Sequence, residues 1–183
     1  QRDEGIAGDL LEIGLFGGLS APLMGMHSTE KETAFFADLK LRDGVSDIVK
    51  NATVGEAKFL EKTSSEITHE HDLGGCQNRF RFIHIDGGHT GTELTLDLKL
   101  ADDILDEKGI IAIDDFFSYM YPQITDATLQ YLRNNRYRLS IILCGFNKAY
   151  LARPHYAHNY LKEIDQGLQS HMVALGFDGM TLF

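Results

Sequence analysis

The chain of 183 residues is poor in several residue types, and each shortage narrows its class. It has no tryptophan, three prolines and two cysteines. Cys76 and Cys144 lie far apart and in no metal-binding spacing, which favours two reduced thiols. No apolar run approaches the roughly 20 residues of a transmembrane helix. Residues 1–9 lack the apolar stretch of a signal peptide. We therefore expect a cytoplasmic protein with one domain over residues 1–183.

Basic residues are scarce as well. The chain has 17 Lys and Arg against 27 Asp and Glu, which gives a net charge of -10. Nucleic acids and anionic membrane surfaces are bound by basic faces, so we expect neither as a partner. Hydrophobic residues make up 43% of the chain, a value typical of a globular domain that buries a core.

Short apolar runs alternate with segments of helical spacing. The apolar runs predict strands at residues 9–13, 33–37, 57–60, 80–85, 110–113, 137–144 and 148–151. Helical spacing or end signals predict helices at residues 20–27, 45–54, 90–105, 124–134 and 155–175. Ser20 is the expected N-cap of the first helix, and Asp106 to Gly109 are expected to close the third. Residues 64–79 are polar and predict a loop or a frayed helix.

This alternation predicts an α/β fold. Several strands are apolar on both faces, which is typical of a Rossmann-like, mostly parallel sheet with helices on both faces. Ligands of such sheets bind at the carboxyl ends of the strands. The notable polar and glycine residues of this chain each follow a predicted strand, so we expect them at one edge of the sheet.

A glycine-rich turn follows the first strand, with the sequence Glu12-Ile-Gly14-Leu-Phe-Gly-Gly18-Leu-Ser20. Glycine allows positive φ and close approach of the backbone to a ligand. The spacing differs from the dinucleotide pattern, which needs a glycine at position 16. Glu12 would accept hydrogen bonds from a positively charged or amide-bearing part of a ligand. The alternative is a tight strand-to-helix turn without a ligand.

Two further residues suit a nucleoside. Asp38 ends the second strand, where a carboxylate can accept both hydroxyls of a ribose. Ser64 and Ser65 follow the third strand and could face an adenine ring. The alternatives are a solvated aspartate at a strand end and ordinary loop serines.

Three carboxylates follow the two most apolar strands: Asp86 after residues 80–85, and Asp114 with Asp115 after residues 110–113. Converging carboxylates raise one another's pKa values unless a cation lies among them. Oxygen ligands suit Mg²⁺, Mn²⁺ or Ca²⁺. The alternative is that Asp114 and Asp115 cap a turn and that Asp86 opens a Gly-Gly loop.

Histidines add two candidates. His89 lies three residues after Asp86, and an imidazole suits a general base at neutral pH. By itself a loop histidine is more often structural or solvated, but the neighbouring carboxylates favour the catalytic interpretation. The segment His69-Glu-His-Asp72 could bind a metal, although its polar setting favours a solvated segment or a flap over the substrate.

These motifs resemble a known family. The E-x-G-x-x-x-G-x-S turn, the run Ile83-His-Ile-Asp-Gly-Gly-His89 and the run Gly109-Ile-Ile-Ala-Ile-Asp-Asp115 resemble class I S-adenosylmethionine-dependent methyltransferases. Within that class the chain is similar to the metal-dependent O-methyltransferases that act on sugars and related hydroxyls of bacterial natural products, such as macrolide and aminocoumarin tailoring enzymes. The resemblance runs from about Asp9 to about Leu151.

The resemblance implies an activity and a set of roles. We expect an O-methyltransferase that uses S-adenosylmethionine and Mg²⁺, acts on a small-molecule hydroxyl acceptor and forms a homo-oligomer. Asp86 would be both metal ligand and catalytic residue, with Asp114 and Asp115 as further ligands and His89 as the base. The cofactor would be bound by Glu12, Gly14, Gly18, Ser20, Asp38 and Ser64.

The chain also departs from the family. Relatives usually carry a helical segment before the first strand, where this sequence has eight residues before Asp9. Covering elements would then be missing or supplied by another subunit. A metal-independent methyltransferase and a cofactor-binding protein without catalysis remain the alternatives. Phe116, Phe117, Tyr119 and Tyr121 would line the acceptor pocket, pack under a loop or form a subunit contact.

Overall fold

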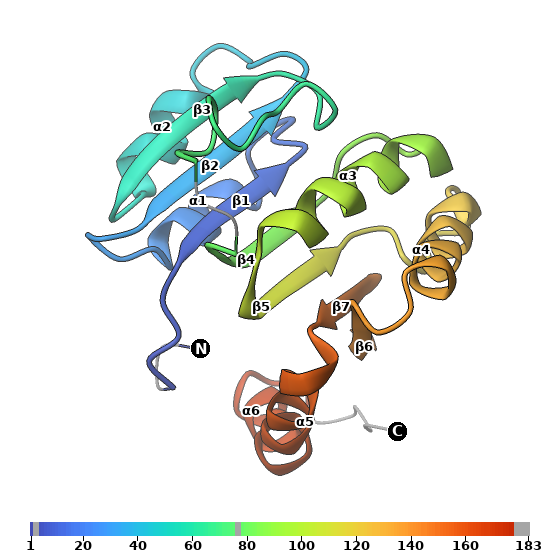
Figure 1. Ribbon diagram of the computed structural model, residues 1–183. Helices are drawn as coiled ribbons and strands as arrows, with labels where there is room; N and C mark the ends of the chain where they lie inside the picture. Colours follow the sequence, from blue (N-terminus) through green and yellow to red (C-terminus); the bar gives the residue numbers. More distant parts are fainter. Residues whose placement is uncertain (2–3, 76–77, 178–183) are drawn as a thin grey trace.

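The computed structural model describes residues 1, 4–75 and 78–177 (Figure 1). Within them, seven strands form one sheet in the order β3-β2-β1-β4-β5-β7-β6. The strands are β1 (Asp9–Ile13), β2 (Thr33–Asp38), β3 (Glu56–Glu61), β4 (Phe80–Ile85), β5 (Leu105–Ile113), β6 (Ser140–Gly145) and β7 (Lys148–Ala152). The helices are α1 (Ala21–Met26), α2 (Val45–Ala52), α3 (Gly91–Ile104), α4 (Pro122–Asn134), α5 (Pro154–Glu163), the π-helical turn η1 (Ile164–Leu168) and α6 (Gln169–Ala174).

The sheet is mostly parallel, as the sequence predicts. Strands β3, β2, β1, β4 and β5 pair in parallel, whereas β7 runs antiparallel to both β5 and β6. This is the Rossmann-like α/β fold. Parallel pairing places the carboxyl ends of five adjacent strands at one edge, and that edge carries the predicted functional residues.

Helices cover both faces of the sheet, because successive strand residues point to opposite sides. Leu10 packs with Phe36 and with residues of α1 and α2 on one face. Leu11 packs with Phe35 and with residues of α3 and α4 on the other. Figure 1 shows α3 and α4 in front of the sheet and α1 and α2 behind it. The continuous apolar runs of the sequence therefore correspond to strands buried on both sides.

One local prediction is wrong, and the predicted N-cap is confirmed in position only. Helix α3 ends at Ile104, and the chain enters β5 at Leu105, so residues 106–109 belong to a strand and do not close the helix. Leu105 is fully buried and pairs with Phe80, so burial and strand pairing outweigh the glycine signal. Gly109 lies inside this strand, and the position favours glycine because an added Cβ would come within 2.7 Å of the Phe80 carbonyl oxygen. Ser20 occupies the N-cap position of α1 but makes no side-chain capping bond.

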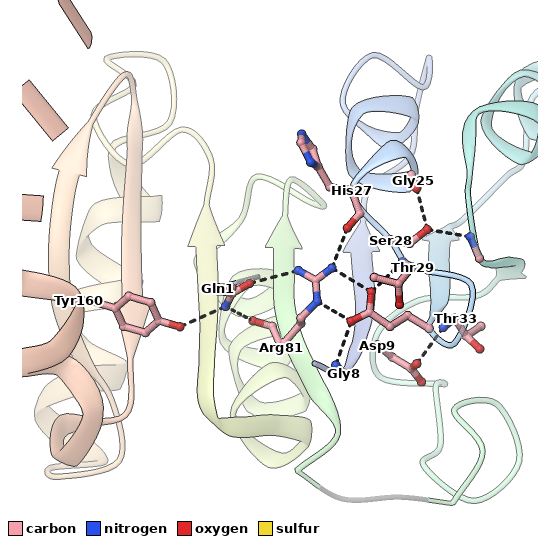
Figure 2. A network of polar contacts seen from close by, with 12 residues as sticks. Gln1, Gly8, Asp9, Gly25, His27, Ser28, Thr29, Thr33, Arg81 and Tyr160 are labelled. Carbon is pink, nitrogen blue, oxygen red and sulfur yellow. Dashed lines mark hydrogen bonds and ion pairs between the residues drawn. The ribbon is translucent and has the colours of Figure 1, made fainter. Parts of the chain in front are cut away.

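A buried ion pair closes the amino edge of the sheet (Figure 2). Arg81 donates from Nε to Glu32 Oε1 at 2.7 Å and from Nη2 to the His27 carbonyl at 2.7 Å. The Gly8 amide also donates to Glu32 Oε1, and Gln1 donates to the Arg81 carbonyl. This network lies at the opposite end of β4 from Asp86, so we assign it to stability.

A second buried network joins α3 to the end of the sheet. Asp102 is fully buried and accepts hydrogen bonds from Arg153, from Arg138 Nε at 2.6 Å and from the Tyr131 hydroxyl at 2.9 Å. Arg153 also donates to the Leu105 carbonyl at 3.2 Å. The hydrogen bonds of Asp102 and Arg153 thus connect α3, α4, β5 and the segment that enters α5.

Three smaller predictions have separate outcomes. Cys144 is an exposed free thiol on β6, whereas Cys76 lies outside the described residues. The described helices include none with the length and apolar character needed to cross a bilayer. The predicted strand at residues 137–144 begins only at Ser140.

Candidate active site

The ends of the parallel strands bring the predicted residues side by side. The pairing of Ile13 with Ile85, and of Ile85 with Ile113, aligns the residues that follow each strand. The ladder continues one step further, because the Asp86 amide donates to the Ile13 carbonyl at 2.8 Å and the Asp114 amide to the Ile85 carbonyl at 2.9 Å. The site is therefore built on rigid sheet ends.

Gly14 is required by the packing of this edge. Its φ is +95°, and a Cβ at this position would collide with the Asp86 carbonyl oxygen. The glycine lets the turn after β1 approach the backbone after β4. Asp38 organises the same turn, since its carboxylate accepts hydrogen bonds from the Phe16 amide at 2.6 Å and from the Lys40 amide at 3.2 Å.

Asp86, His89 and Asp115 form the acidic group of this edge. Their potential ligand atoms all lie within 4.8 Å of one another. His89 Nε2 is 3.0 Å from Asp115 Oδ2, and the imidazole contacts the tilted ring of Tyr121, with 4.0 Å between the ring centroids and 33° between the ring planes. Asn147 donates to the other Asp115 oxygen at 2.9 Å. The prediction that His89 lies beside the carboxylates is confirmed.

The electrostatics of this group fit a cation. Burial raises the pKa of Asp86 to about 6, and the neighbouring charge of Asp114 adds to the rise. An ionised Asp86 is therefore unfavourable in the free protein, and a bound cation would relieve it. The two carboxylates supply oxygen donors, the ligand type that suits Mg²⁺ or Mn²⁺.

Asp114 has different partners. Its carboxylate forms an ion pair with Lys148 and accepts a hydrogen bond from the Asp115 amide at 2.8 Å. It is not among the grouped ligand atoms of the described residues. The structure therefore places Asp114 beside the group, and its role as a metal ligand stays a prediction.

A chain of polar side chains leads inward from Asp114. Lys148 Nζ is 3.2 Å from His84 Nε2, and His84 Nδ1 is 2.9 Å from Glu12 Oε1. Ser20 donates its hydroxyl to the same Glu12 oxygen. Glu12 is fully buried, so its carboxylate is held by protein groups rather than turned toward solvent.

A cavity of about 610 Å³ opens beside the acidic group. The predicted cofactor residues Gly14, Asp38 and Ser64 line it together with Asp86 and His89. Its volume falls in the range of sites for small molecules and cofactors. One cavity thus combines the predicted nucleoside residues with the predicted catalytic residues.

The other predicted cofactor residues lie outside this lining. Glu12 and Ser20 form the buried contact described above, and Ser20 lines a separate groove of about 380 Å³ with His84 and Lys148. Gly18 has a φ of +68°, and an added Cβ would come within 2.6 Å of Val45. These residues shape the turn in this structure, and their contact with a cofactor stays a prediction.

Three polar residues of this edge were missed by sequence reasoning. His84 lies in the apolar run of β4, and a polar residue there is a signal that could have been used. Asp97 lines the cavity from α3, on the same helix face as the buried Leu94 and Leu98. Lys148 opens β7, and nothing in its local sequence distinguishes it.

The aromatic segment after Asp115 divides by burial. Phe116 is buried in the fold, whereas Phe117 and Tyr119 are exposed. Tyr121 contacts His89 and lines the cavity. Of the four aromatic residues, Tyr121 therefore has the position expected of an acceptor-pocket residue.

The segment His69–Asp72 shows no grouped metal ligands among the described residues, and Asp72 pairs with Lys62 at 2.5 Å.

Solved structures share this fold at low sequence identity. CalS11, a TDP-rhamnose 3'-O-methyltransferase of calicheamicin biosynthesis, is 14% identical, with a TM-score of 0.62 over 82% of this chain and 73% of that chain. The O-methyltransferase NovP is 18% identical, with a TM-score of 0.60 over 83% and 74%. MycE of the mycinamycin pathway, in complex with Mg and SAH, is 13% identical, with a TM-score of 0.58 over 80% of this chain and 45% of its own.

A search of curated proteins found no match. A comparison with protein families, in contrast, assigns the chain directly. A family model described as a methyltransferase domain matches residues 11–116. The matched range is more than half of the chain and includes the glycine-rich turn, Asp86, His89 and Asp115. The chain therefore belongs to this methyltransferase-domain family and is an S-adenosylmethionine-dependent methyltransferase.

Proposed function

We propose that the protein is an O-methyltransferase that uses a divalent cation, Mg²⁺, to methylate a hydroxyl of a sugar or another small natural product. The observation that carries the proposal is the acidic group of Asp86, His89 and Asp115 at the cavity lined by Gly14 and Asp38. The comparison structures support it, because CalS11 acts on TDP-rhamnose and MycE contains Mg and SAH.

The residues suggest how methyl transfer to oxygen would proceed. The acceptor oxygen forms a bond to the methyl carbon as the bond from that carbon to the sulfonium sulfur breaks, and the hydroxyl proton leaves to a base. His89 is the base in this proposal, and Asp115 at 3.0 Å stabilises the imidazolium that results. Asp86 and Asp115 would hold the cation, whose charge makes a nearby hydroxyl more acidic. The contact with the Tyr121 ring orients the imidazole.

The cavity would hold the methyl donor. Asp38 would accept the ribose hydroxyls, and Ser64 would lie beside the base. Gly14 gives the donor access to the backbone of the first turn. This arrangement would place the sulfonium end near His89 and so align the donor with the acceptor, which accounts for a large part of the rate of such displacements.

The test is methyl transfer to a panel of sugar hydroxyls, including nucleotide-linked deoxysugars, with Mg²⁺ and with EDTA. We expect turnover with Mg²⁺ and its loss in EDTA. Asp115→Asn and His89→Ala should each lower turnover at least about 100-fold, because they remove a cation ligand and the base. S-adenosylhomocysteine affinity, measured by calorimetry, should change little in either variant. Normal turnover in both variants would contradict the mechanism.

One observation favours a metal-independent methyltransferase as a second candidate. Lys148 already places a positive charge against Asp114, so part of the acidic edge is neutralised by the protein itself. Activity that is undiminished in EDTA would support this candidate. A chain that binds S-adenosylhomocysteine but methylates no acceptor would instead support a binding protein without catalysis.

A further inference from the structure

Lys148 is a cation that lies directly beside the acidic group. It opens β7, and because β7 runs antiparallel to β5, it lies next to Asp114, which follows β5. Its ammonium group forms an ion pair with Asp114 Oδ2, and the other oxygen of this carboxylate accepts a hydrogen bond from the Asp115 amide at 2.8 Å. Both oxygens of Asp114 are therefore engaged by the protein. The proposed cation ligands and base do not include Lys148, so its role requires an explanation.

A second partner holds the ammonium group in this place. Lys148 Nζ is 3.2 Å from His84 Nε2, and His84 Nδ1 is 2.9 Å from Glu12 Oε1. An ammonium group can only donate hydrogen bonds, so Nε2 is the acceptor and the ring proton lies on Nδ1, from which it is donated to Glu12. His84 is then a neutral imidazole. The positive charge of this contact therefore belongs to Lys148, which is held from two sides.

The charges of this edge match a single divalent cation only when Lys148 is counted. Asp86, Asp114 and Asp115 carry one negative charge more than a divalent cation balances, and the lysine supplies the missing positive charge. Burial raises the pKa of Asp86, the charge of Asp114 adds to the rise and the charge of Lys148 opposes it, so the lysine acts on the acidic group as well as on its own partner. Asp86 and Asp115 have no lysine or arginine partner within the described part of the chain. These two carboxylates are thus the ones left for a cation.

We propose that Lys148 takes the place of a second cation at Asp114 and keeps this carboxylate out of the ligand set of the divalent metal. The inference rests on the proposed metal-dependent function, in which Asp86 and Asp115 hold the cation. Lys148 acts through Asp114 and is therefore a positioning residue. Without the ammonium group, Asp114 Oδ2 becomes free to bind a metal, and the edge gains a negative charge. Both changes strengthen the binding of a divalent cation.

The test is calorimetric titration of Mn²⁺ into the protein at pH 8. Lys148→Met should tighten Mn²⁺ binding roughly 10- to 100-fold relative to the wild-type protein. The same substitution in a chain that carries Asp114→Asn should tighten binding clearly less, because the asparagine has no carboxylate to release. Lys62→Met is the matched control: Lys62 lines the cavity but pairs with Asp72, so the affinity should change less than about threefold.

The outcomes separate this assignment from the proposed function. Equal tightening with and without the Asp114 carboxylate would show that Lys148 acts only as a distant charge and would overturn the proposal, as would an unchanged affinity in Lys148→Met. Mn²⁺ binding by Lys148→Met but not by the wild-type protein would support the role of the lysine and contradict a metal-dependent function. Absence of binding in both chains would overturn the metal site itself and the proposal with it.

A second variant guards against a loss of folding. Lys148→Gln removes the charge but keeps a hydrogen-bond donor for Asp114, so it should also tighten Mn²⁺ binding, by less than Lys148→Met. Circular dichroism verifies that each variant folds.

Discussion

At the scale of single residues, the site depends on carboxylates that the fold holds in unfavourable surroundings. Burial raises the pKa of both Asp86 and Asp97 to about 6. Such groups lower the stability of the free protein once they ionise, and they are common where a ligand or cation compensates them. Both residues line the same cavity, so the loss of stability caused by their ionisation arises at the edge of the sheet that carries the candidate site.

The unfavourable ionisation of the buried Asp97 carboxylate predicts that the effect of Asp97→Asn on stability depends on pH. Between the ordinary pKa of 3.8 and about 6, the folded chain binds more protons at Asp97 than the unfolded chain, so its stability falls as pH rises. The asparagine has no charge to bury. We expect it to raise the free energy of unfolding by roughly 1–3 kcal/mol at pH 8 and to have little effect near pH 4.

Urea denaturation at pH 8, 6 and 4 measures this effect. Asp103→Asn serves as the control, because Asp103 is exposed and its ion pair with Arg138 spans 3.2 Å at the surface. An equal gain from Asp97→Asn at all three pH values would show that packing, not the buried charge, is responsible.

At the residue scale, the sequence predicted where the candidate site residues lie but not which side chains they contact. Asp86, His89 and Asp115 were predicted to converge, and the structure brings them together. Strand ends are recognisable because apolar runs stop there. The pairing of Asp114 with Lys148 was not predictable, since these two residues meet only through the antiparallel pairing of β5 with β7.

At the scale of elements, helix α3 runs from the acidic group along the wall of the cavity. It begins directly after His89 and Thr90, and its inner face carries Asp97. A capping box holds its first turn: the Thr90 side chain accepts a hydrogen bond from the Glu93 amide at 3.2 Å, and the Glu93 carboxylate accepts from the Thr90 amide at 3.1 Å. The start of the helix is therefore fixed beside the acidic group.

Loss of this cap predicts a measurable change in stability. Thr90→Ala removes the acceptor for the Glu93 amide and should lower the free energy of unfolding by about 1 kcal/mol. Thr95→Ala is the control, because the Thr95 hydroxyl bonds only to the Gly91 carbonyl inside the helix and its loss should cost less than about 0.5 kcal/mol. Thermal or urea unfolding compares the two. Equal losses would mean that the cap contributes nothing specific.

The elements themselves were largely predictable. Alternating apolar runs and helical spacing located all seven strands, because burial on both faces makes each strand a continuous apolar segment. The boundary at Leu105 was missed, since α3 passes into β5 without a loop. Local end signals such as Gly109 have little influence when the tertiary structure buries the residues on either side.

At the scale of the whole molecule, one buried carboxylate joins the two halves of the fold. Asp102 on α3 is held by Arg153 from the segment between β7 and α5 and by Arg138 before β6. Arg153 is also buried and donates to the Asp102 and Leu105 carbonyls. The antiparallel end of the sheet is thereby fixed to α3.

Removal of this arginine should destabilise the whole fold. We expect Arg153→Met to lower the free energy of unfolding by about 3–5 kcal/mol, because it leaves Asp102 buried with fewer positive partners. Arg138→Met is the comparison variant: its side chain is 49% exposed, so its loss should cost clearly less. Chemical denaturation followed by circular dichroism gives both values. A smaller loss from Arg153→Met than from Arg138→Met would contradict this assignment.

The molecular surface bears on the expected homo-oligomer. Phe117, Tyr119 and Met120 are all more than half exposed and follow Asp115 directly. Exposed apolar side chains next to a cavity suit either an acceptor or a second subunit. The homo-oligomer and the natural-product acceptor stay proposals.

The sequence by itself determined the fold class, the edge at which the site lies and the acidic group with its histidine. It did so because strand burial, strand ends and short spacings can be recognised from residues that are close together in the sequence. Only the tertiary structure decided which carboxylates are paired, which glycines serve packing and that Asp97 enters the cavity. Those facts depend on contacts between residues far apart in sequence, such as Glu12 with His84, which no local pattern records.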